Sequence, residues 1–259
     1  MPISMRSALF SALFMSFSFA AMLAGCGEGA PGTPSGEGSK TPPAADEPAP
    51  EVSPAAAPLP VADWLIVPGE RVGLLTASSG AADLIAAYGA ENVRDEPYPL
   101  GEGESEPGTA VFPDDGTKRM VILWNDLEKK ERPLAVRIDG AGSLWKTAEG
   151  LAVGATLKRV EALNGKPFRL YGFEWDYGGQ LVDSNGGALK DLPHEDPEGG
   201  FRGGALLLAF QPDPTVVATM PAGDYAQVSG DSAFESSHAV MQALDPKISA
   251  ITVNFPDAE

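Results

Sequence analysis

The chain has 259 residues, 43% of them hydrophobic, and 18 Lys and Arg against 36 Asp and Glu give it a formal net charge of −18. This acidic balance argues against a basic surface for nucleic acid or anionic lipid headgroups. A single cysteine excludes an intramolecular disulfide, and two histidines leave few ligands for a zinc site.

Residues 1–25 have the three-part pattern of a secretory signal peptide. Arg6 is the only charged residue before Cys26, the run Ala8–Met22 is apolar or small, and Leu23-Ala24-Gly25 places small residues ahead of the cysteine. A charged head, a short apolar run and a small-residue cleavage site are typical of a secreted protein. A membrane-spanning helix would need about 20 apolar residues.

Leu23-Ala24-Gly25-Cys26 resembles the lipobox of bacterial lipoproteins. The resemblance implies cleavage between Gly25 and Cys26 and a diacylglyceryl group on the Cys26 sulfur, whose two chains would anchor the protein stably in a membrane. It also implies a place in the bacterial cell envelope, outside the cytoplasm. Gly27 follows the cysteine directly. By analogy with the sorting of bacterial lipoproteins, an Asp at this position would favour the inner membrane, so Gly27 favours the outer membrane. The alternative is an ordinary signal peptide with a chance cysteine at its end.

Residues 26–60 are predicted to form a disordered, lipid-anchored linker. The stretch from Gly27 to Pro60 contains nine prolines, seven alanines and five glycines. It holds too little apolar surface to offset the entropy of the chain. We expect a tether that holds the folded part away from the membrane.

The rest of the chain predicts an α+β fold in two tandem units, residues 61–142 and 143–259. In each unit a short helix or helix pair is expected to pack on an antiparallel sheet. The first helix signal has Ser78 or Ser79 as N-cap and Gly89 at its end, with an apolar face of Leu84, Ile85 and Tyr88.

The second helix signal repeats this plan. Thr156 is the expected N-cap and Gly165 the expected end, with Leu157, Val160 and Leu163 on one face. The Asn185-Gly186 pair predicts a hairpin turn. The expected strands are 109–112, 120–124 and 134–138 in the first unit, and 168–175, 180–183, 205–210 and 248–255 in the second.

Part of the second unit resembles the SmpA/OmlA (BamE-like) envelope lipoproteins. The matching positions are Gly154 before the helix, Gly165 and Pro167 after it, and the run Trp175-Asp176-Tyr177. The resemblance implies the fold of β-lactamase inhibitor protein, a helical hairpin on an antiparallel sheet, sometimes in tandem. Members of this group are structural or binding proteins, which favours a non-enzymatic function. The first unit lacks the Gly-x-Pro ending.

No coherent set of catalytic residues or metal ligands emerges, so we expect neither an enzyme nor a cofactor. Asp191, His194, Glu195, Asp196 and Glu198 cluster in one segment, but Pro193, Pro197 and Gly199-Gly200 favour a solvated loop there. The alternative function is a cation-dependent hydrolase on the secreted side. It would use this segment together with the acidic run from Glu102 to Glu106.

Two segments are candidates for a partner surface. Glu102, Glu104 and Glu106 alternate and would share one face of an extended chain, as an acidic loop or as a site for a cation or basic partner. Trp175 and Tyr177 end a row of alternating aromatics that begins at Tyr171 and Phe173. That row is either the core face of a strand or an exposed strip for a protein or glycan. The expected function is a lipid-anchored binding or structural module with an envelope protein as its partner.

Overall fold

The computed structural model describes residues 63–195 and 201–256, all within one compact unit, Pro54–Glu259. The predicted signal peptide, Cys26 and the linker to residue 60 therefore lie outside the described residues. In the described ranges no helix is long and apolar enough to span a membrane.

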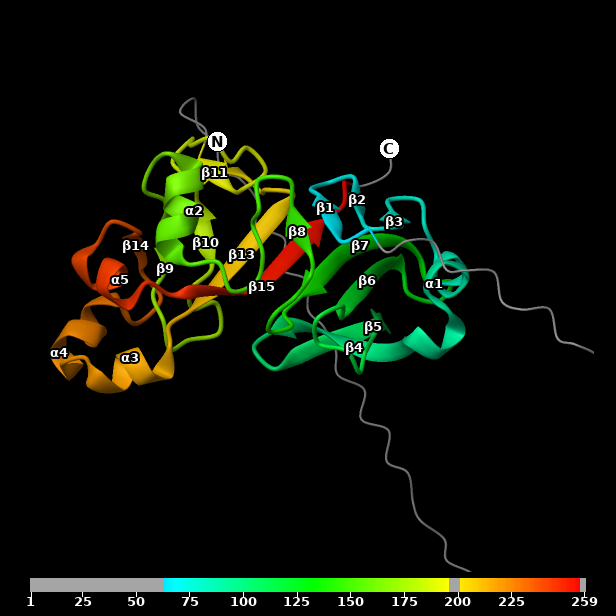
Figure 1. Cartoon of the computed structure of the whole chain (residues 1–259), viewed down its shortest axis with the longest axis horizontal. Helices are drawn as coiled ribbons and strands as arrows, with labels where there is room; N and C mark the ends of the chain where they lie inside the picture. Colours follow the sequence, from blue (N-terminus) through cyan, green and yellow to red (C-terminus); the bar gives the residue numbers. More distant parts are fainter. Residues whose placement is uncertain (1–62, 196–200, 257–259) are drawn as a thin grey trace, which may run out of the picture. The chain divides into compact units, whose positions relative to one another are not determined.

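Short strands make up most of the regular structure (Figure 1). The strands are β1 Leu65–Val67, β2 Arg71–Val72, β3 Leu75–Thr76, β4 Val93–Gly101, β5 Glu104–Val111, β6 Met120–Asp126, β7 Glu131–Ile138, β8 Lys146–Thr147, β9 Arg169–Tyr171, β10 Leu181–Asp183, β11 His194–Glu195, β12 Phe201–Arg202, β13 Leu206–Gln211, β14 Ala233–Glu235 and β15 Lys247–Asn254. The α-helices are α1 Ala81–Tyr88, α2 Leu157–Asn164, α3 Pro214–Thr219, α4 Ala222–Tyr225 and α5 Ala239–Leu244, and the 3₁₀ turns are η1 Ala90–Asn92 and η2 Ala226–Val228.

An antiparallel six-stranded sheet in the order β13-β15-β7-β6-β5-β4 forms the centre of the unit. The last strand of the chain, β15, lies between β13 and β7, with Ile251 opposite Ile138. Strands from before and after residue 142 therefore share one hydrogen-bonded sheet.

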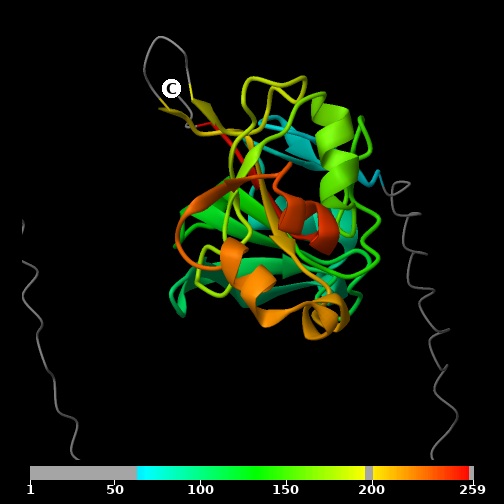
Figure 2. The ribbon, with the colours of Figure 1, turned by 90° about the vertical axis from the view of Figure 1, so that its left-hand side faces the viewer.

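Smaller sheets flank this centre. They are a four-stranded sheet β3-β2-β1-β8, in which β1 and β8 are parallel, a three-stranded sheet β10-β9-β14 and the pair β11-β12. The α-helices are four to eight residues long. In Figures 1 and 2, α2 to α5 gather at one end of the central sheet, and α1 lies at the other.

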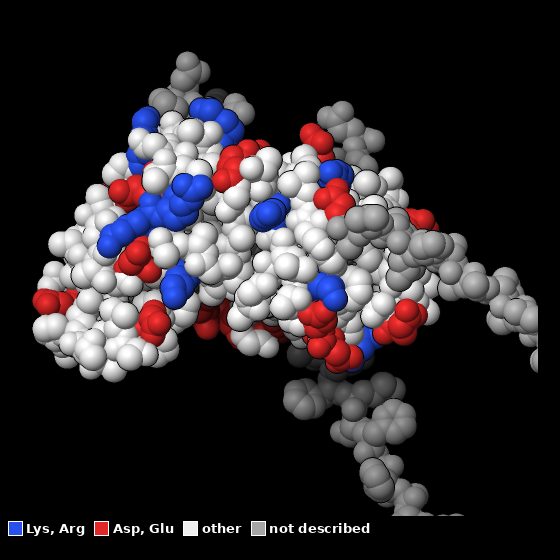
Figure 3. Space-filling model, in the orientation of Figure 1, with Lys and Arg blue, Asp and Glu red and all other residues white. Residues whose placement is uncertain are grey.

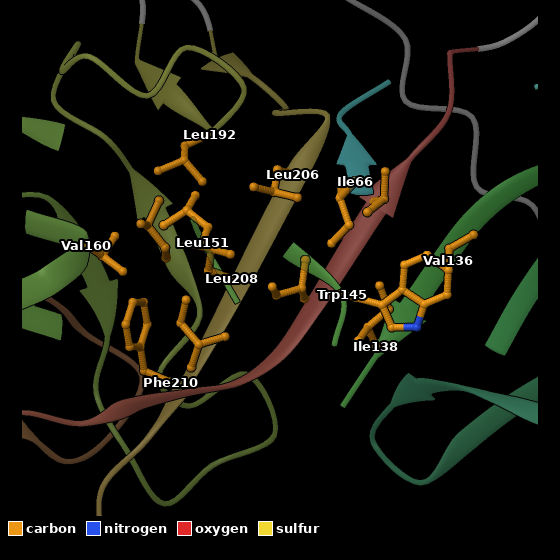
Figure 4. Packing of buried hydrophobic residues seen from close by; sticks show 14 of the residues in the cluster. Ile66, Val136, Ile138, Trp145, Leu151, Val160, Leu192, Leu206, Leu208 and Phe210 are labelled. Carbon is orange, nitrogen blue, oxygen red and sulfur yellow. The ribbon is translucent and has the colours of Figure 1, made fainter. Parts of the chain in front are cut away.

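One hydrophobic core joins both halves of the described chain. Figure 4 shows Ile138 and Trp145 in the same packed layer as Leu206 and Leu208. Trp145 is fully buried, and its indole Nε1 donates a hydrogen bond to the carbonyl of Lys118 at 2.8 Å. Burial of each such large side chain contributes about 1.5–3 kcal/mol to folding.

The predicted fold class, two tandem α+β units with helices packed on separate sheets, is wrong. Strands dominate, the helices are short and peripheral, and β15 completes a sheet begun by β4 to β7. The similarity between the two helix signals reflects local capping and spacing and not two repeated units.

Several local predictions are confirmed. Helix α2 begins after Thr156, whose Oγ1 accepts a hydrogen bond from the N–H of Arg159, and ends at Gly165 with φ of +71°. Strands β6, β7, β10, β13 and β15 lie where strands were expected, with no end shifted by more than three residues.

Others need correction. Gly80, and not Ser78 or Ser79, is the N-cap of α1, because the Ser79 hydroxyl accepts from the N–H of Thr76 instead. Asn185 and Gly186 form a tight turn, both with positive φ, but the two residues do not connect a paired hairpin. Ile85, expected on the apolar face of this first helix, is 46% exposed.

Candidate functional site

The central sheet has one face in the main core and one outer face. On the outer face the small cluster Tyr98, Ala110, Val121, Leu123 and Ala135 is buried. Strand β6 pairs with β5 only from Gly108 onward, whereas β4 pairs with β5 as far as Glu104. The free end of the β4–β5 hairpin therefore continues beyond β6 and bends over this outer face.

Tyr98 shows how far the hairpin bends. It lies on β4 and interacts with the side chain of Thr252 on β15, although β5, β6 and β7 separate these strands in the sheet. Burial raises the pKa of the Tyr98 phenol, and the interaction with Thr252 opposes that shift. The phenol is therefore a neutral, buried group in the neutral pH range.

A groove of about 690 Å³ lies between this hairpin and the turn 175–180. Its floor is the outer face of β7, β13 and β15, including Ala135, Ala209 and Thr252. Grooves that hold small ligands or peptide side chains usually measure ~300–1,000 Å³, so the size is sufficient for either.

Large apolar side chains line the groove while remaining open to solvent. Leu100 is 47% exposed, Leu134 37% and Tyr177 38%. Single exposed apolar residues are common, but several in one concave surface are typical of a binding site.

The predicted aromatic row is not a strand. Strand β9 ends at Tyr171, and Phe173 is buried with 2% exposure. The chain then bends at Glu174, with φ of +67°, into the turn 175–180. Three of the four aromatics still contact one another. The ring centroids of Tyr171 and Trp175 lie 5.0 Å apart, and those of Trp175 and Tyr177 5.4 Å apart.

Hydrogen bonding fixes this aromatic turn. Trp175 donates its indole Nε1 hydrogen to the carbonyl oxygen of Gly172 at 3.0 Å. Its ring edge is thereby fixed, and both Trp175 and Tyr177 line the groove.

The predicted acidic segment lies at the end of the hairpin, next to Tyr98–Gly101, which line the groove. Glu102 and Gly103, with φ of +52° and +77°, make a two-residue turn between β4 and β5. Glu106 is the cross-strand partner of Tyr98, so its side chain and that of Glu104 project from the groove face of the hairpin. Figure 3 shows acidic side chains gathered over β4 and β5 along the lower edge of the molecule.

The structure brings the two candidate segments together. A Cβ placed on Gly101 would lie 3.4 Å from Cε1 of Tyr177, so the aromatic turn packs against the residue next to Glu102. The hairpin end and the aromatic turn, which are far apart in the sequence, thus lie side by side at the groove mouth. No local pattern in the sequence indicates the lining residues Tyr98, Arg137 and Thr252, because only the long-range strand pairing brings them together.

The charged side chain of the floor, Arg137, is paired, whereas the carboxylates around the mouth form no ion pair with any described residue. Arg137 donates from Nε to Asp139 at 3.1 Å, and Asp139 also binds Arg119 at 2.9 Å. Arg119 forms a further close ion pair with Glu96. Within the described ranges, no ion pair involves any of the four mouth carboxylates, Glu102, Glu104, Glu106 and Asp176.

The second acidic segment, from Asp191, lies elsewhere. Burial, followed by the charges of Glu149 and Glu70, raises the pKa of Asp191. Residues 196–200, with Asp196 and Glu198, are outside the described residues. Across the described ranges, no three His, Cys, Asp or Glu side chains are arranged to hold a metal ion. The other histidine, His238, caps α5 by accepting from the N–H of Val240 at 3.2 Å.

Comparison with known proteins gives no relative. No protein-family model, no curated protein and no solved structure matches this chain.

Proposed function

We propose that this chain is a lipid-anchored protein of the bacterial cell envelope that binds a partner in the groove between the β4–β5 hairpin and the turn 175–180, without catalysing a reaction. The anchor would be two acyl chains on Cys26, and the Pro-rich segment up to residue 60 would be the tether.

The observation that carries the proposal is the clustering of exposed apolar side chains in one groove. Leu100, Leu134 and Tyr177 approach the same space from three separate elements. Contact between these apolar side chains and water is unfavourable. A bound partner that covers them would gain about 25 cal/mol per Å² of apolar surface buried. Aromatic side chains such as Trp175 and Tyr177 also contribute strongly to protein interfaces.

A photo-crosslinking residue at position 134 tests the groove in cells. Leu134 lines the groove, whereas Leu144 is similarly exposed, at 43%, and lies outside it. We expect a discrete crosslinked adduct from position 134 and none from position 144. Equal adducts from both positions, or none from either, would overturn the proposal for the groove.

The same strains test the anchor. We expect mass spectrometry to find an acylated Cys26 at the N-terminus, and Cys26→Ser to release the protein from the membrane fraction and weaken the adduct. An unmodified peptide that spans Gly25 and Cys26 in the native protein would overturn the proposed lipidation.

A further inference from the structure

We propose that the occupant of this groove is a peptide segment that carries Lys or Arg beside aliphatic side chains. The inference rests on the proposed binding function of the groove and names the chemistry of its partner. It follows from the charges at the mouth, from the apolar side chains of the interior, and from the lack of free backbone N–H groups at positions along the edges of the central sheet.

Charge at the mouth selects a cationic partner. Asp176 lines the groove, and Glu102, Glu104 and Glu106 lie beside it at the end of the hairpin, next to the lining residue Gly101. All four are exposed, and within the described ranges no ion pair neutralises them. The whole chain carries a net charge of −18, so the long-range field also repels anions and attracts cations.

Among the described residues that line the groove, the one arginine does not reverse this selection. Arg137 is held by Asp139, which lies between Arg137 and Arg119. Arg119 is balanced in turn by Glu96. The floor therefore offers polar contacts without an excess positive charge for an anionic ligand.

The interior selects aliphatic groups beside the cation. Leu100, Leu134 and Leu207 line the groove. The faces of Trp175 and Tyr177 are the kind of surface on which an ammonium or guanidinium group binds by cation–π attraction. A residue such as Lys supplies both an apolar stem and a charged end.

Both edges of the central sheet disfavour a partner that adds to it as an extra strand. The partner is therefore expected to bind through its side chains. On the β13 side, the N–H groups of Leu206 and Phe210 already donate to the carbonyls of Asp191 and Gly179. The other edge strand, β4, contains Pro97 and Pro99, which lack the N–H that an added strand would need.

Isothermal titration calorimetry on the full-length chain with Cys26→Ser tests the inference. The probe is a synthetic peptide of alternating Lys and Leu. The comparison probes are the same peptide with Glu for Lys, the same with Ser for Leu, and a neutral chito-oligosaccharide. We expect one-to-one binding of the Lys-Leu peptide and at least tenfold weaker binding of each other probe.

Two triple variants with the same net charge distinguish binding at the groove from attraction to the acidic protein as a whole. The triple variant Glu102→Gln, Glu104→Gln, Glu106→Gln should weaken Lys-Leu binding about tenfold, since exposed ion pairs each contribute a few-fold. The control triple Glu70→Gln, Glu128→Gln, Glu149→Gln removes three exposed carboxylates that lie outside both the β4–β5 hairpin and the turn 175–180, and it should leave affinity unchanged. Leu134→Ser should weaken binding through the apolar contact.

The outcomes are separable. Equal losses in both triple variants would overturn the inference, because binding would then follow net charge alone. Tighter binding of the Glu-Leu peptide or of the oligosaccharide would overturn the cationic class and leave the groove as a binding site. If no probe binds while position 134 still crosslinks in cells, the partner class is wrong. If position 134 does not crosslink either, the proposed function itself fails.

Discussion

At the scale of single residues, Asn164 shows how a buried polar group joins distant parts of the fold. Its side-chain Nδ2 donates to the carbonyls of Lys166 at 3.0 Å and Ser184 at 2.9 Å, and it is only 1% exposed. A Cβ on Gly187 would lie 2.0 Å from its Oδ1, so the loop after β10 approaches as closely as it does only because residue 187 is glycine. The end of α2 and that loop are thereby held together.

We expect Asn164→Ala to lower the free energy of unfolding by about 1–3 kcal/mol, because it leaves buried carbonyl groups without donors. Urea denaturation followed by circular dichroism measures the change. Asn125→Ala is the matched control: Asn125 is exposed, and its loss should change stability by less than about 0.5 kcal/mol. Equal effects of the two substitutions would contradict this role for Asn164.

At the scale of elements, the sequence predicts those helices and strands whose structure is determined by residues close together in the chain. Helix α2 was predicted correctly because its cap, its apolar spacing and its terminal glycine all lie within ten residues of one another. Strand β4 was not predicted, since Pro97, Pro99 and its charged residues resemble a loop, and its one buried residue, Tyr98, is buried by strands far along the chain. Edge strands often carry such prolines and charges.

The two halves of the groove mouth illustrate the same limit. The alternation along 171–177 predicted a strand with one aromatic face, but the strand ends at Tyr171 and Phe173 enters the core. In β15 the alternation is interrupted, because the register with β13 shifts between Ala209 and Phe210. Turns and register shifts of this kind depend on partner strands, which a pattern within one segment does not contain.

Helix α2 also gives a prediction at this scale. Its eight residues depend on the bond from the N–H of Arg159 to the hydroxyl of Thr156, at 3.2 Å. Thr156→Ala should therefore destabilise the protein by about 1 kcal/mol in thermal or urea unfolding, whereas Thr156→Ser, which keeps the acceptor, should cost much less. An alanine variant as stable as the serine variant would show that packing alone holds this helix.

At the scale of the whole molecule, the position of β15 has a consequence for cooperativity. Because β15 pairs with β13 on one side and with β7 on the other, neither part of the chain can complete the central sheet by itself. The core is likewise continuous, since Ile138 and Trp145 belong to the same buried cluster as Leu206 and Leu208 (Figure 4).

We therefore expect the described part of the chain to unfold in one transition, with equal calorimetric and van't Hoff enthalpies.

A fragment of residues 61–142 leaves the β15-facing edge of β7 unpaired and exposes Val136 and Ile138, which are fully buried in the complete chain. Alone, it should lack both a near-ultraviolet circular dichroism signal and a sigmoidal urea transition. Mixing it with residues 143–259 should restore both, because β15 can then pair with β7. A cooperative transition in the isolated 61–142 fragment would mean that this half forms its own core, and that β15 adds to a sheet that is already stable.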